Sequence, residues 1–322
     1  MSRHTSALKG PHQGVALRPS FITSVSDRRL SDVLGDVRSI SSVDQFDLMV
    51  LRLVDLMEIQ NWLRPQGKSL QIKDPSASIL DWSVADVLSR ERNLSCICDW
   101  IEVQMQAAEQ SVHAMAPDGD ECQLKVAAFA TFFPDLTCRV PVLGDSSHGQ
   151  QMDRRQTAVA ALSNTMVLAT RLVELGLMRQ AIVEIVGGGV LDQCECPECQ
   201  VDRTKSDLND RNDYIVESSI EKKTEILIES LCEVHDRVAE ECGDAPWACA
   251  LEVEPGDSFF VNSLSVVKSV FDNLPPHLHA HVGLNLDIGH MCILRETGEP
   301  IDPIEQLKNH PDLAYRVIHA HI

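Results

Sequence analysis

Six residues that could bind a metal ion or transfer a proton lie in three pairs near the end of the sequence. The pairs are Glu252 with Glu254, Asp287 with His290, and His319 with His321. Each pair closes a short apolar run of the kind that forms a buried strand. Carboxylate oxygens and imidazole nitrogens together suit a divalent cation of the Mn, Zn, Co or Fe type. Polar residues also gather wherever a loop begins, but three such strand ends in succession favour a metal site.

The segments between these apolar runs have the period of a helix. In the first of them, one face carries Leu264, Val267, Phe271 and Leu274. Strand, helix, strand, helix and strand in this order are typical of parallel βαβ units. Because ligands of parallel α/β folds bind at the carboxyl ends of the strands, we expect the three pairs to form one site.

Three motifs occur in this order within residues 251–322: L-E-V-E-P-G, G-L-N-L-D-I-G-H and V-I-H-A-H-I. In order and spacing they resemble strands five, six and seven of the xylose isomerase-like TIM barrels. That superfamily includes sugar isomerases, sugar-phosphate and ketose epimerases, and AP endonucleases. The resemblance covers residues 247–322 and extends back to about Leu124. It implies an α/β protein built as a TIM (β/α)8-type barrel, a fold of roughly 250 residues.

The resemblance also implies which residues hold a divalent cation, for which Mn, Zn, Co and Mg are the candidates. The ligands would be a glutamate of strand five, Asp287 and His321. Glu252 is the first choice for that glutamate and Glu254 is the alternative. His319 is likewise the alternative to His321.

The implied chemistry is proton transfer next to the carbonyl group of a sugar or a sugar phosphate, as in carbohydrate metabolism. The metal would polarise the carbonyl and its neighbouring hydroxyl, and a carboxylate would remove the α-proton to give an enediolate. Return of the proton to the other carbon isomerises the sugar, and return to the opposite face epimerises it. The candidate catalytic residues are therefore Glu252, Glu254 and His290. His290 would orient the substrate or bind a metal.

A polar loop at residues 192–213 contains three cysteines in a C-x-C-x-x-C pattern, Cys194, Cys196 and Cys199. Three thiolates could hold a structural Zn ion as a second metal site, but a closed zinc site needs four ligands. Candidates for the fourth are Asp192, Cys232 and His235. The alternatives are a redox pair and an exposed loop. With a structural zinc, the protein could instead be a non-catalytic barrel that acts as a scaffold or binding module.

The composition narrows the class of protein. The 322 residues are 44% hydrophobic, enough for one large core, and the formal net charge is −20. Nucleic-acid binding relies on Lys and Arg that displace counterions, so this acidic chain argues against nucleic acid and against the endonuclease branch. No apolar run approaches the ~20 residues of a membrane helix, and no secretory signal is expected. Eleven scattered cysteines in a domain of this size are typical of reduced thiols, so we expect a cytoplasmic protein.

Apolar periodicity predicts the remaining elements. Strands are expected at residues 124–136 and 181–192, and helices at residues 43–63, 154–175 and 214–241. Glu184 lies inside the second of these strands, where a charged side chain is costly unless it is paired or bound. We therefore expect Glu184 to face the barrel and to contact a cation or an arginine.

We expect residues 1–40 to form a tail with a first strand near residues 18–25, and residues 41–322 to form the barrel. The sequence stops at Ile322, inside the expected strand seven. It contains neither the H-x-x-D or H-x-x-E ending of that strand nor the glutamate of strand eight. The prediction is a barrel truncated within strand seven that binds metal weakly and is catalytically inactive. Its open edge would invite a partner or a homo-oligomer.

Overall fold

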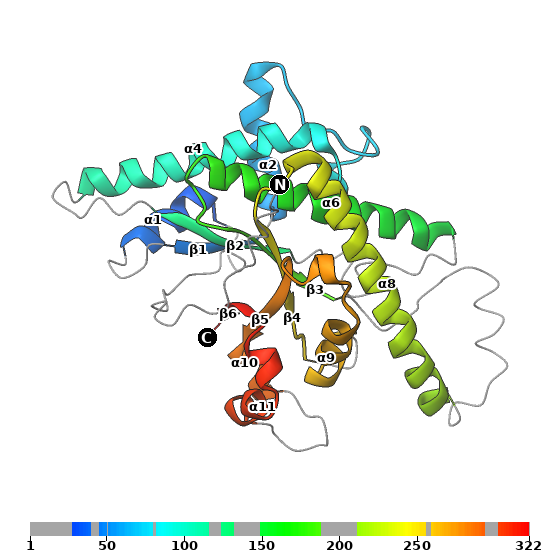
Figure 1. Cartoon of the computed structure of the whole chain (residues 1–322). Coiled ribbons are helices and arrows are strands. Elements are labelled where there is room, and N and C mark those ends of the chain that lie inside the picture. The colour runs from blue at the N-terminus through cyan, green and yellow to red at the C-terminus, as the bar shows by residue number, and fades with distance from the viewer. Residues whose placement is uncertain are drawn as a thin grey trace, which may run out of the picture.

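The structure of the chain is a computed structural model that describes residues 28–39, 45–49, 51–79, 82–115, 124–131, 149–187, 211–255, 259–293 and 302–321. Six parallel strands follow one another in the sheet in the same order as in the sequence (Figure 1). They are β1 (Gln45–Met49), β2 (Lys125–Thr131), β3 (Ala181–Val186), β4 (Trp247–Glu252), β5 (Val282–Asp287) and β6 (Val317–His321). This order is that of successive parallel βα units.

Helices connect the strands and cover the outer side of the sheet (Figure 1). They are α1 (Leu30–Ser39), α2 (Leu53–Leu63), α3 (Val84–Leu88), α4 (Glu91–Met115), α6 (Gly149–Glu174), α8 (Arg211–Cys242), α9 (Leu264–Asn273), α10 (Ile288–Ile293), α11 (Pro303–Asn309) and α12 (Pro311–Ala314), with short 3-10 turns η1 (Arg64–Gln66) and η3 (Pro276–Leu278). α6 packs on β2, β3 and β4, and α4 and α8 pack on α6. No helix within the described ranges is both long enough and apolar enough to cross a membrane.

The sheet curls so that its first and sixth strands face each other across its inner side. β1 and β6 are not neighbours in the described sheet, yet Oδ1 of Asp47 in β1 lies 3.4 Å from Nε2 of His319 in β6. A flat sheet would hold these strands roughly 24 Å apart, because neighbouring strands are about 4.8 Å apart. The curl confirms the predicted α/β fold of the TIM-barrel type.

Two apolar clusters pack against the strands. The larger cluster includes Phe46 and Phe129, both fully buried, and fills the space between the strands and the helices. The smaller cluster consists of Ala128, Ile182 and Ala250. Ala128 pairs in register with Asp47 and Ala250 with Glu184, so the cluster lies on the inner side of the curl. The two alanines leave room on that side for the carboxylates and imidazoles described below.

The sequence predicts a single helix over residues 43–63, and this prediction is wrong for its first part. The structure divides the segment into β1 and α2 at Leu51, whose φ of 47° lies in the left-handed region. α2 begins after Arg52, whose backbone N–H and guanidinium both donate to the carboxylate of Asp55, at 2.9 and 2.7 Å. A short strand buried on both faces lacks the alternation of polar and apolar residues, so its apolar run is easily read as part of a helix.

The other predicted elements lie within or close to their expected ranges. α6 and α8 begin at residues 149 and 211, earlier than predicted, and buried Arg155 of α6 ties them together. Nε of Arg155 donates to Oγ of Ser230 at 3.1 Å, and its guanidinium also pairs with Glu233.

Part of the predicted N-terminal tail is structured. Residues 30–39 form α1, which packs on α4 and whose Leu30 and Leu34 are fully buried. The strand expected near residues 18–25 lies outside the described residues.

A β-bulge in the pairing of β5 with β6 orients the histidines of β6. The register shifts just before Asn285, so that Ile318 is skipped. Beyond this point His319 pairs with Asn285, and His321 pairs with Asp287. Because paired residues of neighbouring strands share a face of the sheet, both histidines point to the same side as the polar residues of β5.

Gly283 of β5 lies against the skipped residue Ile318. A Cβ at Gly283 would sit 2.7 Å from three side-chain atoms of Ile318, closer than van der Waals contact allows. Ile318 is β-branched and has few alternative rotamers, so it cannot yield easily. Glycine at this position therefore allows β6 to approach β5 with the histidines in place.

We expect Gly283→Ala to destabilise the protein by about 1–3 kcal/mol, the usual cost of overpacking a buried site. The matched control is Gly35→Ala in α1, where a Cβ would meet no atom within 4 Å. Removing a glycine from a helix interior should stabilise the protein by about 0.5–1 kcal/mol. Urea unfolding monitored by circular dichroism measures both changes. A Gly283→Ala protein with the wild-type midpoint would contradict the close packing of β5 on β6.

Candidate metal centre

Three neighbouring strands end side by side, and each ends in a predicted metal ligand. β4 ends at Glu252, β5 at Asp287 and β6 at His321. Asp287 pairs with His321 in register, and Glu252 pairs with Asn285, two residues before Asp287. The common direction of the strands thus brings the three side chains to one edge of the sheet.

We call Glu252, Asp287 and His321 the outer cluster. Nδ1 of His321 lies 3.7 Å from Oε1 of Glu252 and 3.5 Å from Oδ2 of Asp287. One donor atom from each residue lies within 4.8 Å of the others. The three side chains are between 10% and 19% exposed, so a small ligand can reach them. Two carboxylates and one imidazole are a donor set that suits Mn, Co or Zn.

His290 and Glu254 lie beside the outer cluster. Nδ1 of His290 is 3.4 Å from Oε1 of Glu252 and 3.8 Å from Oε2 of Glu254, and its Nε2 is 3.8 Å from Oδ2 of Asp287. The backbone N–H of His290 donates to Oδ1 of Asp287 at 2.8 Å. Asp287 therefore uses one oxygen to hold the first turn of α10 and directs the other toward the imidazoles.

The two glutamates that follow one another at the end of β4 ionise differently. Burial raises the pKa of Glu252, but contacts with His290 and His321 outweigh burial and lower the pKa to about 2. Burial and the nearby charge of Glu252 raise the pKa of Glu254 to about 7. Contact with Glu252 raises the pKa of His290 to about 9. Glu252 is thus held as an anion, whereas Glu254 can gain or lose a proton near neutral pH.

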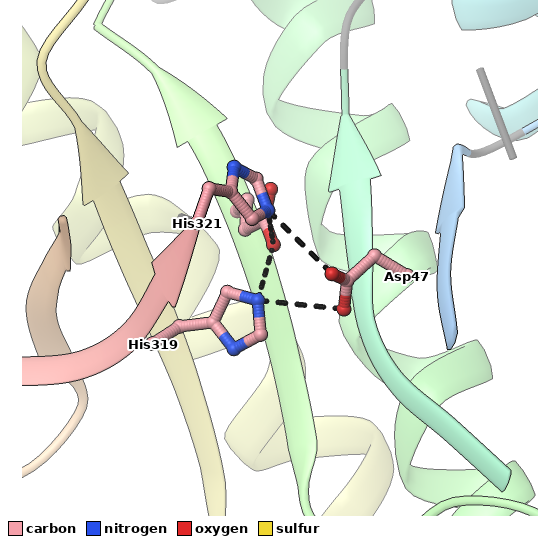
Figure 2. A group of neighbouring side chains, drawn as sticks. Asp47, His319 and His321 are labelled. Atoms are coloured by element: carbon pink, nitrogen blue, oxygen red, sulfur yellow. Dashed lines mark ion pairs between the residues drawn. The ribbon is translucent and has the colours of Figure 1, made fainter. Parts of the chain in front are cut away.

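Further inside the curl lies a second group of donors, which we call the inner cluster: Asp47, Glu184, His319 and His321. Nε2 of His319 lies 3.0 Å from Oε1 of Glu184 and 3.4 Å from Oδ1 of Asp47. Nε2 of His321 lies 3.3 Å from the same Glu184 oxygen and 3.6 Å from Oδ2 of Asp47. Figure 2 shows both imidazoles of β6 turned toward the carboxylate of Asp47.

His321 belongs to both clusters because its ring lies between them. Nδ1 faces Glu252 and Asp287, and Nε2 faces the two inner carboxylates. A neutral imidazole has one lone pair for a metal and one N–H. A cation bound at Nδ1 would therefore leave the Nε2–H to donate to an inner carboxylate, a pattern that orients many metal-bound histidines.

The imidazoles of the inner cluster are strongly basic. Burial lowers the pKa of His321, but contacts with Asp47, Glu184 and Glu252 outweigh burial and raise the pKa to about 12. The same balance, with Asp47 and Glu184 as partners, raises the pKa of His319 to about 9. Because a metal binds only the deprotonated imidazole, uptake of a cation by either cluster would release protons.

The structure brings together the five predicted residues Glu252, Glu254, Asp287, His290 and His321, which lie at or just after the ends of β4, β5 and β6. It adds Asp47, which was predicted to lie in a helix, and Glu184, which was predicted to face the barrel and to contact a cation or an arginine and whose partners are the imidazoles of His319 and His321. His319, named as an alternative to His321, lies beside it. An aspartate within a short apolar run is the signal that could have identified Asp47. The three cysteines of the loop at residues 192–213 lie outside the described residues, so the zinc site there stays a prediction.

No family model matches the sequence, and no curated protein matches it. Solved structures are similar to most of the chain at low sequence identity. A 3-keto-D-glucoside 4-epimerase from E. coli in its apo form matches with 14% identity and a TM-score of 0.48, over 95% of this chain and 79% of its own. A D-tagatose 3-epimerase-like protein matches with 11% identity and a TM-score of 0.44, over 87% of this chain and 67% of its own.

A protein of Sinorhizobium meliloti 1021 also matches, with 13% identity and a TM-score of 0.43, over 92% of this chain and 69% of its own. Two of these three structures are named as sugar epimerases or as like them.

We expect Asp287→Asn to weaken Mn²⁺ binding to the outer cluster at least about tenfold, as losses around metal sites commonly do. The amide keeps an oxygen that can accept from the backbone N–H of His290, but it removes the negative charge. The control is Asp244→Asn, an exposed carboxylate in the turn after α8. Isothermal titration calorimetry with Mn²⁺ makes the measurement. Equal affinity in the two variants would show that the outer cluster does not hold the cation.

Proposed function

We propose that the chain is a divalent-metal-dependent sugar or sugar-phosphate isomerase or epimerase, acting by proton transfer next to a carbonyl through an enediolate. The observation that carries the proposal is the outer cluster with Glu254 beside it. Two carboxylates and an imidazole form a set of three ligands, and a third carboxylate that is not needed as a ligand lies next to them.

Glu252, Asp287 and His321 are the proposed ligands. A bound divalent cation would draw electron density from the carbonyl and hydroxyl oxygens of the substrate and so acidify the hydrogen on the carbon between them. Glu252 fits this role better than Glu254 because its carboxylate reaches Nδ1 of His321 at 3.7 Å and forms one group of donors with Asp287.

Glu254 is the proposed base. It would take the proton from the carbon next to the carbonyl and return it to the neighbouring carbon, which isomerises the sugar. Epimerisation would need a second acid to deliver a proton to the opposite face. Its side chain is 16% exposed at the rim of the outer cluster, so a substrate bound there can approach it. The backbone N–H of Glu254 donates to the carbonyl oxygen of Val261 at 3.0 Å, which fixes the chain at this position.

His290 would orient the substrate. Its ring contacts carboxylates of Glu252, Glu254 and Asp287, and Nδ1 also lies 3.2 Å from the carbonyl oxygen of Val253. The ring is therefore held in place from several sides. An imidazole N–H at this point can donate to a hydroxyl or carbonyl oxygen of a sugar.

The resemblance of the strand-end motifs supports a sugar as the substrate, and the charge of the site favours a neutral sugar over a sugar phosphate. The two clusters, together with Glu254 and His290 beside them, contain five carboxylates and three imidazoles. A phosphate group bound next to this excess of negative charge would be repelled.

We expect purified protein with Mn²⁺ or Co²⁺ to exchange the α-proton of a neutral aldose or ketose for deuterium in D₂O. Proton NMR measures this exchange for each sugar of a panel. Exchange needs only one base and one cation, so it reports the first half of the reaction. Glu254→Gln should slow exchange at least about 100-fold, the usual contribution of a general base, and leave Mn²⁺ affinity within a few-fold of wild type.

Glu240→Gln, an exposed glutamate of α8, serves as the matched control and should exchange at the wild-type rate. Exchange that does not depend on Glu254, or that continues after the metal is removed with EDTA, would refute the proposed mechanism. A protein that binds the cation but exchanges no sugar proton would instead be a binding protein.

A further inference from the structure

We propose that the inner cluster is a second cation site, in which Asp47, Glu184, His319 and Nε2 of His321 bind one divalent transition-metal ion. This inference concerns binding and does not depend on the proposed function. Asp47, Glu184 and His319 do not belong to the outer cluster, and only His321 is shared.

Four donor atoms from three strands converge on one point. β1 supplies Asp47, β3 supplies Glu184, and β6 supplies both histidines. All four atoms lie within 4.8 Å of one another. Ligands at 2.0–2.2 Å from a central ion must lie roughly 3–4 Å apart. The imidazole nitrogens lie 3.0 and 3.3 Å from the same Glu184 oxygen, and 3.4 and 3.6 Å from one Asp47 oxygen each. The spacing thus matches what a single ion requires.

The second observation is that these close contacts are not hydrogen bonds of ordinary geometry. Within the described residues, Oε1 of Glu184 and Nε2 of both His319 and His321 are buried and have no hydrogen-bond partner. Glu184 is only 2% exposed, and its oxygen points at the two imidazoles. Buried polar groups are nearly always satisfied, so lone pairs directed at a common centre indicate a ligand between them.

A network of ion pairs between protonated histidines and carboxylates is the alternative. In such a network each N–H would be aligned with an oxygen, since that alignment provides most of the energy that offsets burial. The nitrogens instead face the carboxylates at short distance without alignment. With neutral imidazoles, two carboxylates carry a charge of −2, which a divalent ion balances in the buried interior.

Asn285 supports the same conclusion. It is fully buried, and neither its amide nitrogen nor its amide oxygen has a hydrogen-bond partner among the described residues. It pairs in register with Glu252 on one side and His319 on the other, between the two clusters. A water molecule bound to a metal in either cluster would give this amide a partner.

The donor set indicates which ions fit. Two imidazole nitrogens and two carboxylate oxygens suit Zn²⁺, Co²⁺, Mn²⁺ or Fe²⁺, whereas Mg²⁺ and Ca²⁺ prefer oxygen ligands alone. His321 can direct only one lone pair at a time while neutral. When Nε2 binds the inner ion, His290 is the imidazole next to Glu252 and Asp287 that can complete the outer site.

The experiment is a Co²⁺ titration of metal-free protein, read by visible absorption and by elemental analysis after gel filtration. Wild type should bind two Co²⁺ ions, Glu184→Gln one, Asp287→Asn one, and the double variant none. A tenfold excess of Mg²⁺ should not displace the ion that remains in Asp287→Asn. Circular dichroism confirms that each variant is folded. Should Glu184→Gln not fold, His319→Gln, whose side chain is 12% exposed, replaces it and should also bind one ion.

Equal Co²⁺ content in Glu184→Gln and wild type would refute the inner site. The inner cluster would then be a network of ion pairs without a metal. Loss of one ion in Glu184→Gln with no loss in Asp287→Asn would support the inner site while refuting the outer ligands of the proposed function. The two proposals therefore fail separately.

Discussion

The contact of Asp47 with the two imidazoles of β6 is the interaction on which the site depends. It joins the two ends of a six-stranded sheet that are not hydrogen-bonded to each other. Only a curled sheet allows this contact, and the curl in turn requires small side chains on the inner face. Ala128 and Ala250 occupy that face and leave space for charged groups. Packing and chemistry therefore constrain the same positions.

The buried carboxylates explain why the imidazoles stand where they do. Asp47 and Glu184 are each at most 2% exposed, and a charge so deeply buried is costly unless it is balanced. The bulge at Ile318 sets both histidines of β6 on the face where they can balance it. His321 extends this balance to Glu252 and Asp287, so the two clusters form one electrostatic unit with a single shared ring. A change of charge in either cluster will therefore change the electrostatic potential in the other cluster through the ring of His321.

Much of this arrangement follows from the sequence, and the rest does not, for definite physical reasons. Glu252, Asp287 and His321 end consecutive parallel strands, and the direction of such strands alone brings strand ends to one edge. Asp47 could not be placed, because the short run around it has no period that separates a strand from a helix. Its partners lie more than 270 residues away, and only the curl of the sheet brings them together.

Glu184 and His319 could be predicted in part. A glutamate in an apolar strand indicates that the side chain has a partner, but not which residue the partner is. The choice between two histidines spaced by two residues cannot be made from alternation alone, because both lie on the same face. In the structure both are used, His319 toward the inner carboxylates and His321 toward both sets.

The position of β6 has a kinetic consequence. Both nitrogen ligands of the inner cluster lie on this one strand, whereas the carboxylates come from β1 and β3 and are buried. Single segments of a fold open locally far more often than a whole domain unfolds. An ion held in the inner cluster would escape when β6 swings away, and not by stepwise exchange of ligands. Its residence time would then equal the lifetime of the closed strand and would be independent of chelator concentration.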